Sequence, residues 1–74
     1  MIEKYFRIKK KDIAPVQFIV ESYEGMASVT TIDPQEAVIR IFIMPGFEEI
    51  IEELLLELKK NYSLQEIKEF VRKI

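Results

Sequence analysis

Few side chains in this sequence could carry out acid–base or nucleophilic chemistry. The 74 residues include no His and no Cys, so a nucleophile would have to be a hydroxyl with no base close to it in the sequence. The candidate hydroxyls are Ser22, Ser28, Ser63 and the threonines. Two carboxylate pairs, Glu48/Glu49 and Glu52/Glu53, could do acid–base work or hold Mg²⁺, but their spacing fits the solvated face of a helix better. The sequence predicts no enzyme activity, no metal site and no cofactor.

One arginine is a stronger candidate for a binding role. Arg40 interrupts the otherwise apolar run Ala37–Met44, and a guanidinium in such a place needs a partner because burying an unpaired charge is costly. Three roles stay open for it: an ion pair with an acidic side chain, a contact to an anionic or carboxylate ligand, or exposure to solvent. Arg7 and Tyr5 are the other candidate polar contacts.

The charges are segregated along the chain. Residues 1–12 carry five Lys or Arg and two Asp or Glu, residues 13–58 carry one and nine, and residues 59–74 carry five and two. An acidic body disfavours binding to a phosphate backbone. RNA-recognition domains carry aromatic side chains on an open sheet face, and Tyr5 and Phe42 could share such a face. However, Ala37–Met44 lacks the Gly- and Lys/Arg-rich aromatic signature of those domains. We therefore expect no nucleic acid partner.

Size favours association with another subunit. A chain this short buries only about 60% of its unfolded surface, and without Cys or His it has no disulfide or Cys/His metal site to add stability. No apolar run reaches the length of a membrane span or forms a signal peptide, so we expect a cytoplasmic protein. The abundant Glu, Lys and Ile resemble the usage of thermophiles.

The N-terminal half predicts a strand and a helix. In Ile2–Lys9 apolar and charged residues alternate with a period of two. The stretch Lys9–Phe18 then joins the strand to a helix, with Asp12 as the N-cap and Pro15 in the first turn. The helix runs to about Glu24 and ends at Gly25. Its apolar stripe consists of Ile13, Val16, Ile19, Val20 and Tyr23.

The middle of the chain predicts a hairpin. Residues 26–33 form a short stretch rich in β-branched side chains, which is typical of a strand. Asp33 and Pro34 suit the first two positions of a type I turn. The strand that follows, Ala37–Met44, is apolar on both faces, which is typical of a central strand. One face carries Ile39, Ile41 and Ile43, and the other carries Val38, Arg40, Phe42 and Met44.

The C-terminal part predicts two helices. Residues 47–60 show a stripe of Phe47, Ile50, Ile51, Leu54 and Leu58, with acidic residues at the start and lysines at the end. Ser63 and Glu66 match a capping box, and Tyr62 with Ile67 matches a hydrophobic staple. The resulting amphipathic helix 61–74 would bury Leu64, Ile67, Val71 and Ile74.

These elements predict one α+β domain over residues 1–74, with a βαββα core at 1–60. A right-handed crossover followed by a hairpin gives a three-stranded antiparallel-type sheet of order 1-3-2. The fold would be a ferredoxin-like sandwich in which a helix replaces the last strand.

The stretch Asp12–Leu55 resembles a family of small uncharacterised bacterial proteins catalogued as a domain of unknown function. The patches that carry the resemblance are Glu-Ser-Tyr-Glu-Gly, Asp-Pro and Pro-Gly-Phe-Glu-Glu. More distantly the pattern is similar to ACT domains. That resemblance implies regulatory modules that pair side by side and bind amino acids or other small effectors at the subunit interface.

Two functions follow as hypotheses. The first is a homodimeric ACT-like module that binds a small effector or a partner protein at its interface, with Arg40, Arg7 and Tyr5 as polar contacts. The second is a protein-binding adaptor that docks through the C-terminal helix together with the outward-facing Phe18 and Leu56. In both, leaving the second face of the central strand bare would forgo about 1.5 to 3 kcal/mol per side chain. The expected interface residues are Val38, Phe42, Met44, Phe18, Leu56, Leu64, Ile67 and Val71.

Overall fold

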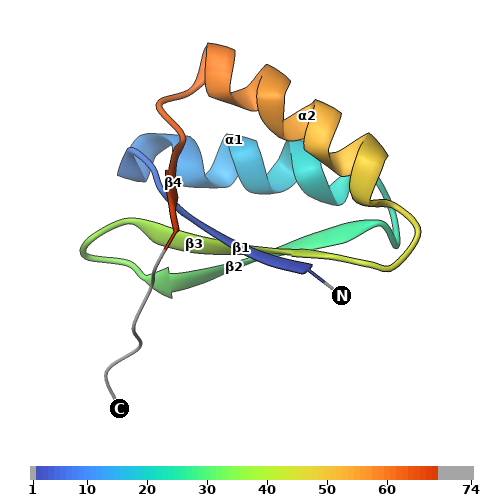
Figure 1. Ribbon diagram of the computed structural model, residues 1–74. Helices are drawn as coiled ribbons and strands as arrows, with labels where there is room; N and C mark the ends of the chain where they lie inside the picture. Colours follow the sequence, from blue (N-terminus) through green and yellow to red (C-terminus); the bar gives the residue numbers. More distant parts are fainter. Residues whose placement is uncertain (1, 69–74) are drawn as a thin grey trace.

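Six elements follow one another along the chain. They are β1 (Ile2–Arg7), α1 (Lys10–Glu21), β2 (Ala27–Asp33), β3 (Val38–Ile43), α2 (Glu48–Asn61) and β4 (Gln65–Ile67). A computed structural model defines them and describes residues 2–68. The strands form one four-stranded sheet of order β2-β3-β1-β4 in which each neighbouring pair is antiparallel. Both helices lie on one side of the sheet (Figure 1), so the predicted α+β class is confirmed.

The predicted sheet is wrong at its outer end. It was expected to have three strands of order 1-3-2, but a fourth strand, β4, pairs with β1. Gln65–Ile67 is this strand, so the helix expected over 61–74 is wrong where the structure describes it. The capping-box pattern is a local preference, whereas β1 offers a row of unpaired backbone groups, and tertiary context overrides such preferences. Val71 and Ile74 lie outside the described residues.

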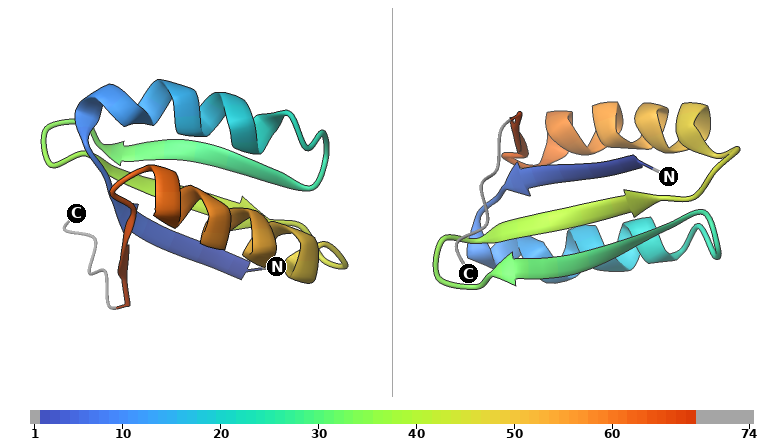
Figure 2. Two further views of the ribbon diagram at one scale, coloured as in Figure 1. Left: turned by 90° about the horizontal axis from the view of Figure 1, so that it is seen from above. Right: turned by 60° about the horizontal axis from the view of Figure 1, so that its bottom comes forward.

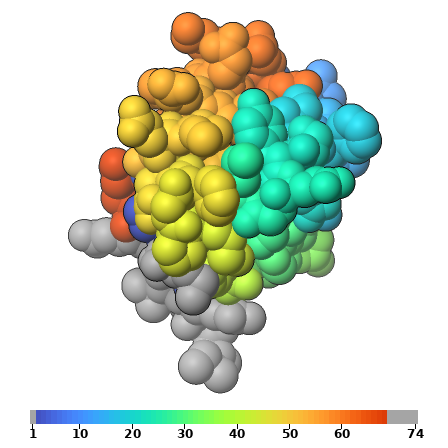
Figure 3. All heavy atoms as spheres, turned by 90° about the vertical axis from the view of Figure 1, so that its right-hand side faces the viewer, coloured from blue at the N-terminus to red at the C-terminus, as the bar shows by residue number. Residues whose placement is uncertain are grey.

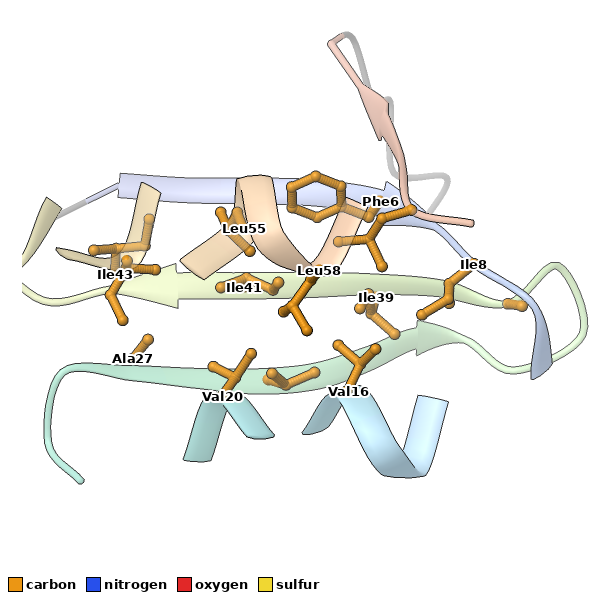
Figure 4. Close-up of a cluster of buried hydrophobic side chains, with 14 residues drawn as sticks. Phe6, Ile8, Val16, Val20, Ala27, Ile39, Ile41, Ile43, Leu55 and Leu58 are labelled. Carbon is orange, nitrogen blue, oxygen red and sulfur yellow. The ribbon is translucent and has the colours of Figure 1, made fainter. Parts of the chain in front are cut away.

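The core lies between the sheet and the helices. Phe6, Ile39, Ile41 and Ile43 are fully buried, as their alternation in β1 and β3 predicts. Figure 4 shows these side chains pointing toward Val16 and Val20 of α1 and toward Leu55 and Leu58 of α2. Ile13, Ile19 and Tyr23 of the predicted α1 stripe are partly buried against the same cluster. Burial on this face therefore fixes which side of the sheet the helices cover.

Helix α1 begins earlier than predicted. Its N-cap is Lys9, which makes no side-chain capping bond, and Asp12 lies inside the first turn. Pro15 is consequently an internal helix residue rather than a first-turn residue. The helix ends at Glu21 instead of Glu24, and the Ser22 hydroxyl donates to the Ile19 carbonyl at 2.6 Å. The Asp12 carboxylate therefore interacts favourably with the positive N-terminal end of the helix dipole, but it does not cap the helix.

The hairpin between β2 and β3 forms as predicted. The Asp33 carboxylate accepts bonds from the Gln35 and Glu36 backbone N–H groups at 3.0 and 3.1 Å, the Asx pattern that makes Asp favourable at a turn. Ala37 closes the turn with a positive φ of 56°. A register shift between Thr31 and Asp33 marks a bulge in β2.

The buried stripe of helix α2 matches the prediction at Ile51 and Leu58, and Phe47 and Leu54 are partly buried against the core as expected. It differs from the prediction at Ile50 and Leu55. Ile51, Leu55 and Leu58 are buried, whereas Ile50 is 45% exposed. The helix begins one residue later than expected, and the Gly46 N–H donates to the Glu48 carboxylate at 3.0 Å. Figure 3 shows the yellow-to-orange side chains of α2 meeting the cyan and teal ones of α1 and the following turn to close the helix layer. No helix within residues 2–68 is long and apolar enough to cross a membrane.

Candidate ligand-binding face

The side of the sheet opposite the helices gathers the predicted polar site residues. The right-hand panel of Figure 2 shows this side, with the strands in front of the helices. We call it the open face. Strand register and the alternation of side chains assign its members. They are Ser28 and Thr30 of β2, Val38, Arg40 and Phe42 of β3, Glu3, Tyr5 and Arg7 of β1, and Gln65 and Ile67 of β4.

One row of residues crosses all four strands on the open face. Arg40 lies directly opposite Thr30 on one side and Tyr5 on the other, and Tyr5 lies opposite Ile67. Neighbouring strands are about 4.8 Å apart, so the Arg40 guanidinium has a hydroxyl-bearing neighbour on each side. Such a row offers a cation, two hydroxyl groups and an apolar side chain.

Arg40 is the cation of the row, and the part of the chain that the structure describes gives it no carboxylate partner. Within residues 2–68 no acidic side chain forms an ion pair with it. Its Nε is buried and has no hydrogen-bond partner among these residues. The guanidinium carbon lies 5.7 Å from the centre of the Phe42 ring, a cation–π distance. The expected pairing of Arg40 with an acidic side chain is therefore absent from the described part of the chain.

The other two predicted contacts lie on the same face but are engaged differently. Arg7 forms an ion pair of 3.8 Å with Glu36, and both side chains are more than half exposed, so the pair is weak. The Tyr5 hydroxyl donates to the Glu3 carboxylate at 2.9 Å. Arg40, Arg7 and Tyr5 thus share one face, with Arg40 at its centre.

The predicted interface residues do not form one surface. Val38 is already buried, at 2% exposure, and Phe42 and Met44 are partly buried. We expected the second face of β3 to be exposed unless another helix or subunit covered it. The burial of these side chains shows that this face is less exposed than expected. Phe18 and Leu56 do point outward as predicted, at 77% and 60% exposure, but they lie on the helix layer.

The C-terminal members of the predicted interface fall elsewhere. Leu64 is buried and belongs to the core between sheet and helices, so it offers no docking surface. Ile67 is partly buried in β4 on the open face. Val71 lies outside the described residues.

A charged cluster that sequence reasoning missed holds β4 in place. The Glu66 side chain is 19% exposed and lies 3.7, 3.8 and 3.6 Å from the amines of Lys4, Lys59 and Lys68. Lys4 also contacts Glu52 at 3.1 Å. The signal available in the sequence was the concentration of basic residues at both ends of the chain. Without the β1–β4 pairing, that signal did not say which carboxylate the lysines meet.

Metal binding finds no support in the described residues. Between residues 2 and 68 no group of three or more Asp and Glu side chains is placed to hold an ion. One carboxylate of each predicted pair serves another contact, since Glu48 accepts the Gly46 N–H and Glu52 pairs with Lys4.

Comparison with known proteins agrees with the resemblance carried by the sequence patches. Residues 6–61 match the model of the domain of unknown function DUF4911, which covers more than half of the chain. The chain belongs to the DUF4911 family. No curated protein and no solved structure matches it, and no link to ACT domains is found. The family match ends before β4, so the strand held by the charged cluster lies outside the matched region.

Proposed function

We propose that this DUF4911 protein is a non-catalytic, cytoplasmic regulatory module that acts as a homodimer and binds a small carboxylate-bearing effector on its open face. The observation that carries the proposal is the state of Arg40. A guanidinium whose Nε is buried and has no partner within residues 2–68 is short of an acceptor, and each such group costs free energy until it is satisfied. A ligand carboxylate bound to the guanidinium would supply that acceptor once the Arg40 side chain turns its covered Nε toward the open face.

The surroundings of Arg40 favour a small ligand with an apolar part. Thr30 and Tyr5 flank Arg40 across the strands, and Phe42 and Ile67 lie on the same face. An arginine binds a carboxylate through two parallel hydrogen bonds, the hydroxyls can orient a second polar group, and the apolar side chains can contact a hydrocarbon chain or ring. Amino acids and related carboxylic acids fit this combination.

The fold is consistent with such a role. The βαββαβ order and the sheet order 2-3-1-4 with both helices on one side support a ferredoxin-like assignment. ACT-like modules share that arrangement, and this likeness of architecture is analogy rather than evidence of activity.

The adaptor hypothesis loses its docking element. It required a helix over residues 61–74, whereas Gln65–Ile67 is a strand and Leu64 lies in the core. Phe18 and Leu56, which completed the docking surface in this hypothesis, are exposed as expected, but they lie on different helices and no C-terminal helix over Gln65–Ile67 joins them. We therefore favour the ligand-binding module.

A ligand screen on two charge-matched variants tests the proposal. The wild-type protein, Arg40→Gln and Lys60→Gln are exposed to a panel of amino acids, other small carboxylates and inorganic phosphate, and melting temperature and backbone amide NMR shifts are followed. Lys60 is an exposed α2 lysine whose one ion pair within residues 2–68 is with Glu57, so its variant removes one charge away from the open face. At least one carboxylate should bind wild type and Lys60→Gln with the same affinity and Arg40→Gln at least tenfold more weakly.

The NMR shifts give the contradicting outcome. Shifts should concentrate at Thr30, Tyr5, Arg40 and Phe42. If no panel member binds, or if binding maps to α1 or α2 and survives Arg40→Gln, the proposal is wrong. A single-stranded oligonucleotide at low salt is included in the panel. If the protein binds it, the ligand class is nucleic acid and the small-effector proposal is wrong.

A further inference from the structure

We propose that the outer edge of β2 pairs antiparallel with β2 of a second copy of this chain, so that two four-stranded sheets join into one. The inference names the interface of the homodimer, and it rests on that part of the proposed function. The ligand part does not depend on it.

The two edges of the sheet are protected differently. At one edge β4 is only three residues long and its surroundings carry Lys4, Glu66 and Lys68. Short strands and charges are the usual means by which proteins prevent edge pairing. At the other edge β2 has seven residues, and Ala27–Ile32 contains no charge and no Pro. Within residues 2–68 no strand pairs with the outer side of β2 (Figure 2).

The backbone of β2 offers a defined set of hydrogen-bonding groups outward. Met44 donates its N–H to the Met26 carbonyl at 2.9 Å, so this cross-strand pair is hydrogen-bonded. Because hydrogen-bonded and non-bonded pairs alternate along an antiparallel ladder, Ser28 and Thr30 bond to β3. Ala27, Val29 and Thr31 therefore direct their N–H and C=O groups away from the sheet.

These outward groups are complementary to themselves about a two-fold axis. When Val29 faces Val29 of the second copy, Ala27 faces Thr31 and all three outward residues find hydrogen-bonding partners. The bulge between Thr31 and Asp33 ends the regular strand just beyond this five-residue stretch. The stretch that can pair is thus the stretch whose geometry is regular.

A second copy suits this edge better than a foreign peptide. An isologous contact needs a patch that complements itself, and a neutral strand pairs with its own copy without like-charge repulsion. The open face is a weaker interface because Val38 is buried and Phe42 is partly buried.

Pairing would also extend the ligand face. Ser28 of each copy comes to lie opposite Thr30 of the other on the open face. The hydroxyl groups of both copies then form a continuous polar surface between the two Arg40 side chains. The second copy would therefore add hydroxyl groups to the surface next to each Arg40.

Cysteine pairing tests the register directly, because the chain has no native Cys. Ser28 and Thr30 of opposite copies would have Cα atoms about 4.5 Å apart, within the range that a disulfide spans. Mixing full-length Ser28→Cys with Thr30→Cys under air oxidation should give a disulfide-linked heterodimer. Each variant alone should give little cross-linking, and equal cross-linking in all three samples would overturn the register.

Mass in solution tests the edge itself. Thr31→Pro removes an outward N–H without removing a bond to β3, whereas Thr31→Val keeps the N–H and serves as the control. Multi-angle scattering should show a dimer for wild type and Thr31→Val and a monomer for Thr31→Pro, with far-UV circular dichroism confirming that each variant is folded. If Thr31→Pro does not fold, the cysteine mixture decides.

The outcomes separate the two proposals. A wild-type monomer at all concentrations, for example because α1 keeps a second copy away, overturns both the edge pairing and the homodimer. A dimer that survives Thr31→Pro and gives no mixed disulfide overturns the edge alone. Binding of the carboxylate panel, lost in Arg40→Gln, is measured separately and stands or falls independently of both results.

Discussion

At the scale of single residues, side-chain alternation predicts which residues share a face but not what they contact. Arg40, Arg7 and Tyr5 lie on one face because they occupy alternate positions on neighbouring strands. The Arg7–Glu36 contact depends on how the β2–β3 turn approaches β1, and no local pattern encodes that approach. Whether a carboxylate within residues 2–68 reaches Arg40 depends in the same way on the whole arrangement of the sheet.

Replacing Arg40 by an apolar residue should cost little stability. Its guanidinium has no ion pair within residues 2–68 and its Nε has no hydrogen-bond partner there, so Arg40→Met removes an unsatisfied polar group and loses only the cation–π contact with Phe42 among the described residues. We expect a change in the free energy of unfolding of less than about 1 kcal/mol in either direction. Urea unfolding measures it, and a loss above about 2 kcal/mol would mean that Arg40 has a strong partner.

Gly46 is required for its backbone conformation rather than for space. Its φ is 90°, and a Cβ built on it meets no atom within 4 Å. Gly46→Ala should therefore destabilise the protein by about 1 to 2 kcal/mol through backbone strain alone, and Gly46→Asn by less because Asn tolerates positive φ. Equal losses for the two variants in urea unfolding would point to an unseen packing contact.

At the scale of elements, the prediction succeeded where an apolar period is long and failed where a short motif competed with strand pairing. The periods of β1, α1, β3 and α2 identified four elements to within a few residues. The segment after Asn61 fits both a capping box and a strand, and its fate depends on the free edge of β1 and on the lysines around Glu66. Those features exist only in the assembled fold.

The pairing of β4 should be sensitive to salt through Glu66. Glu66→Gln keeps the size of the side chain and removes the charge that faces Lys4, Lys59 and Lys68. We expect faster hydrogen exchange of the β4 amides and a stability loss of up to about 1 kcal/mol at low salt. The difference from wild type should shrink at 1 M NaCl, where the Debye length is only about 3 Å.

Glu57→Gln is the matched control for that experiment. Among the described residues 2–68, Glu57 pairs with Lys60 alone, on the exposed side of α2 at 4.0 Å, so its loss should leave β4 exchange unchanged. A salt-independent effect of Glu66→Gln would show that the side chain acts through packing instead of charge.

Two adjacent leucines in α2 test which face of the helix is buried. Leu55 is 2% exposed and lies in the core, whereas Leu56 is 60% exposed. Leu55→Ala should cost about 2 to 5 kcal/mol, because it leaves a cavity in the core, while Leu56→Ala should stay within about 0.5 kcal/mol. Chemical denaturation of both variants is the measurement. Similar losses would place Leu56 in a contact made outside residues 2–68.

At the scale of the whole molecule, one layer of helices on a four-stranded sheet leaves one face and one edge of the sheet without a covering helix or strand among residues 2–68. The helix layer buries the apolar faces of β1 and β3, and the same alternation puts Arg40 and its hydroxyl neighbours on the open face. The neutral β2 edge and the charged β4 edge then make the two ends of the sheet unequal. Composition and period could predict the layers, but not which edge stays unprotected, because that depends on where the last strand docks.

The absence of His and Cys should make the stability of the whole molecule insensitive to pH near neutrality. These are the side chains whose reference pKa values fall between about 6 and 9, so apart from the terminal amine no group is expected to exchange protons on unfolding in that range. Since the slope of stability against pH follows the difference in bound protons, we expect the free energy of unfolding to vary by less than about 0.5 kcal/mol between pH 6 and 8.5. Thermal unfolding at constant ionic strength measures it.

Below about pH 4 protonation of the carboxylates leaves the positive charge of 11 Lys and Arg unopposed, and self-repulsion should lower stability. A steep change near pH 7 would instead reveal a lysine or carboxylate whose folded environment moves its titration into that range.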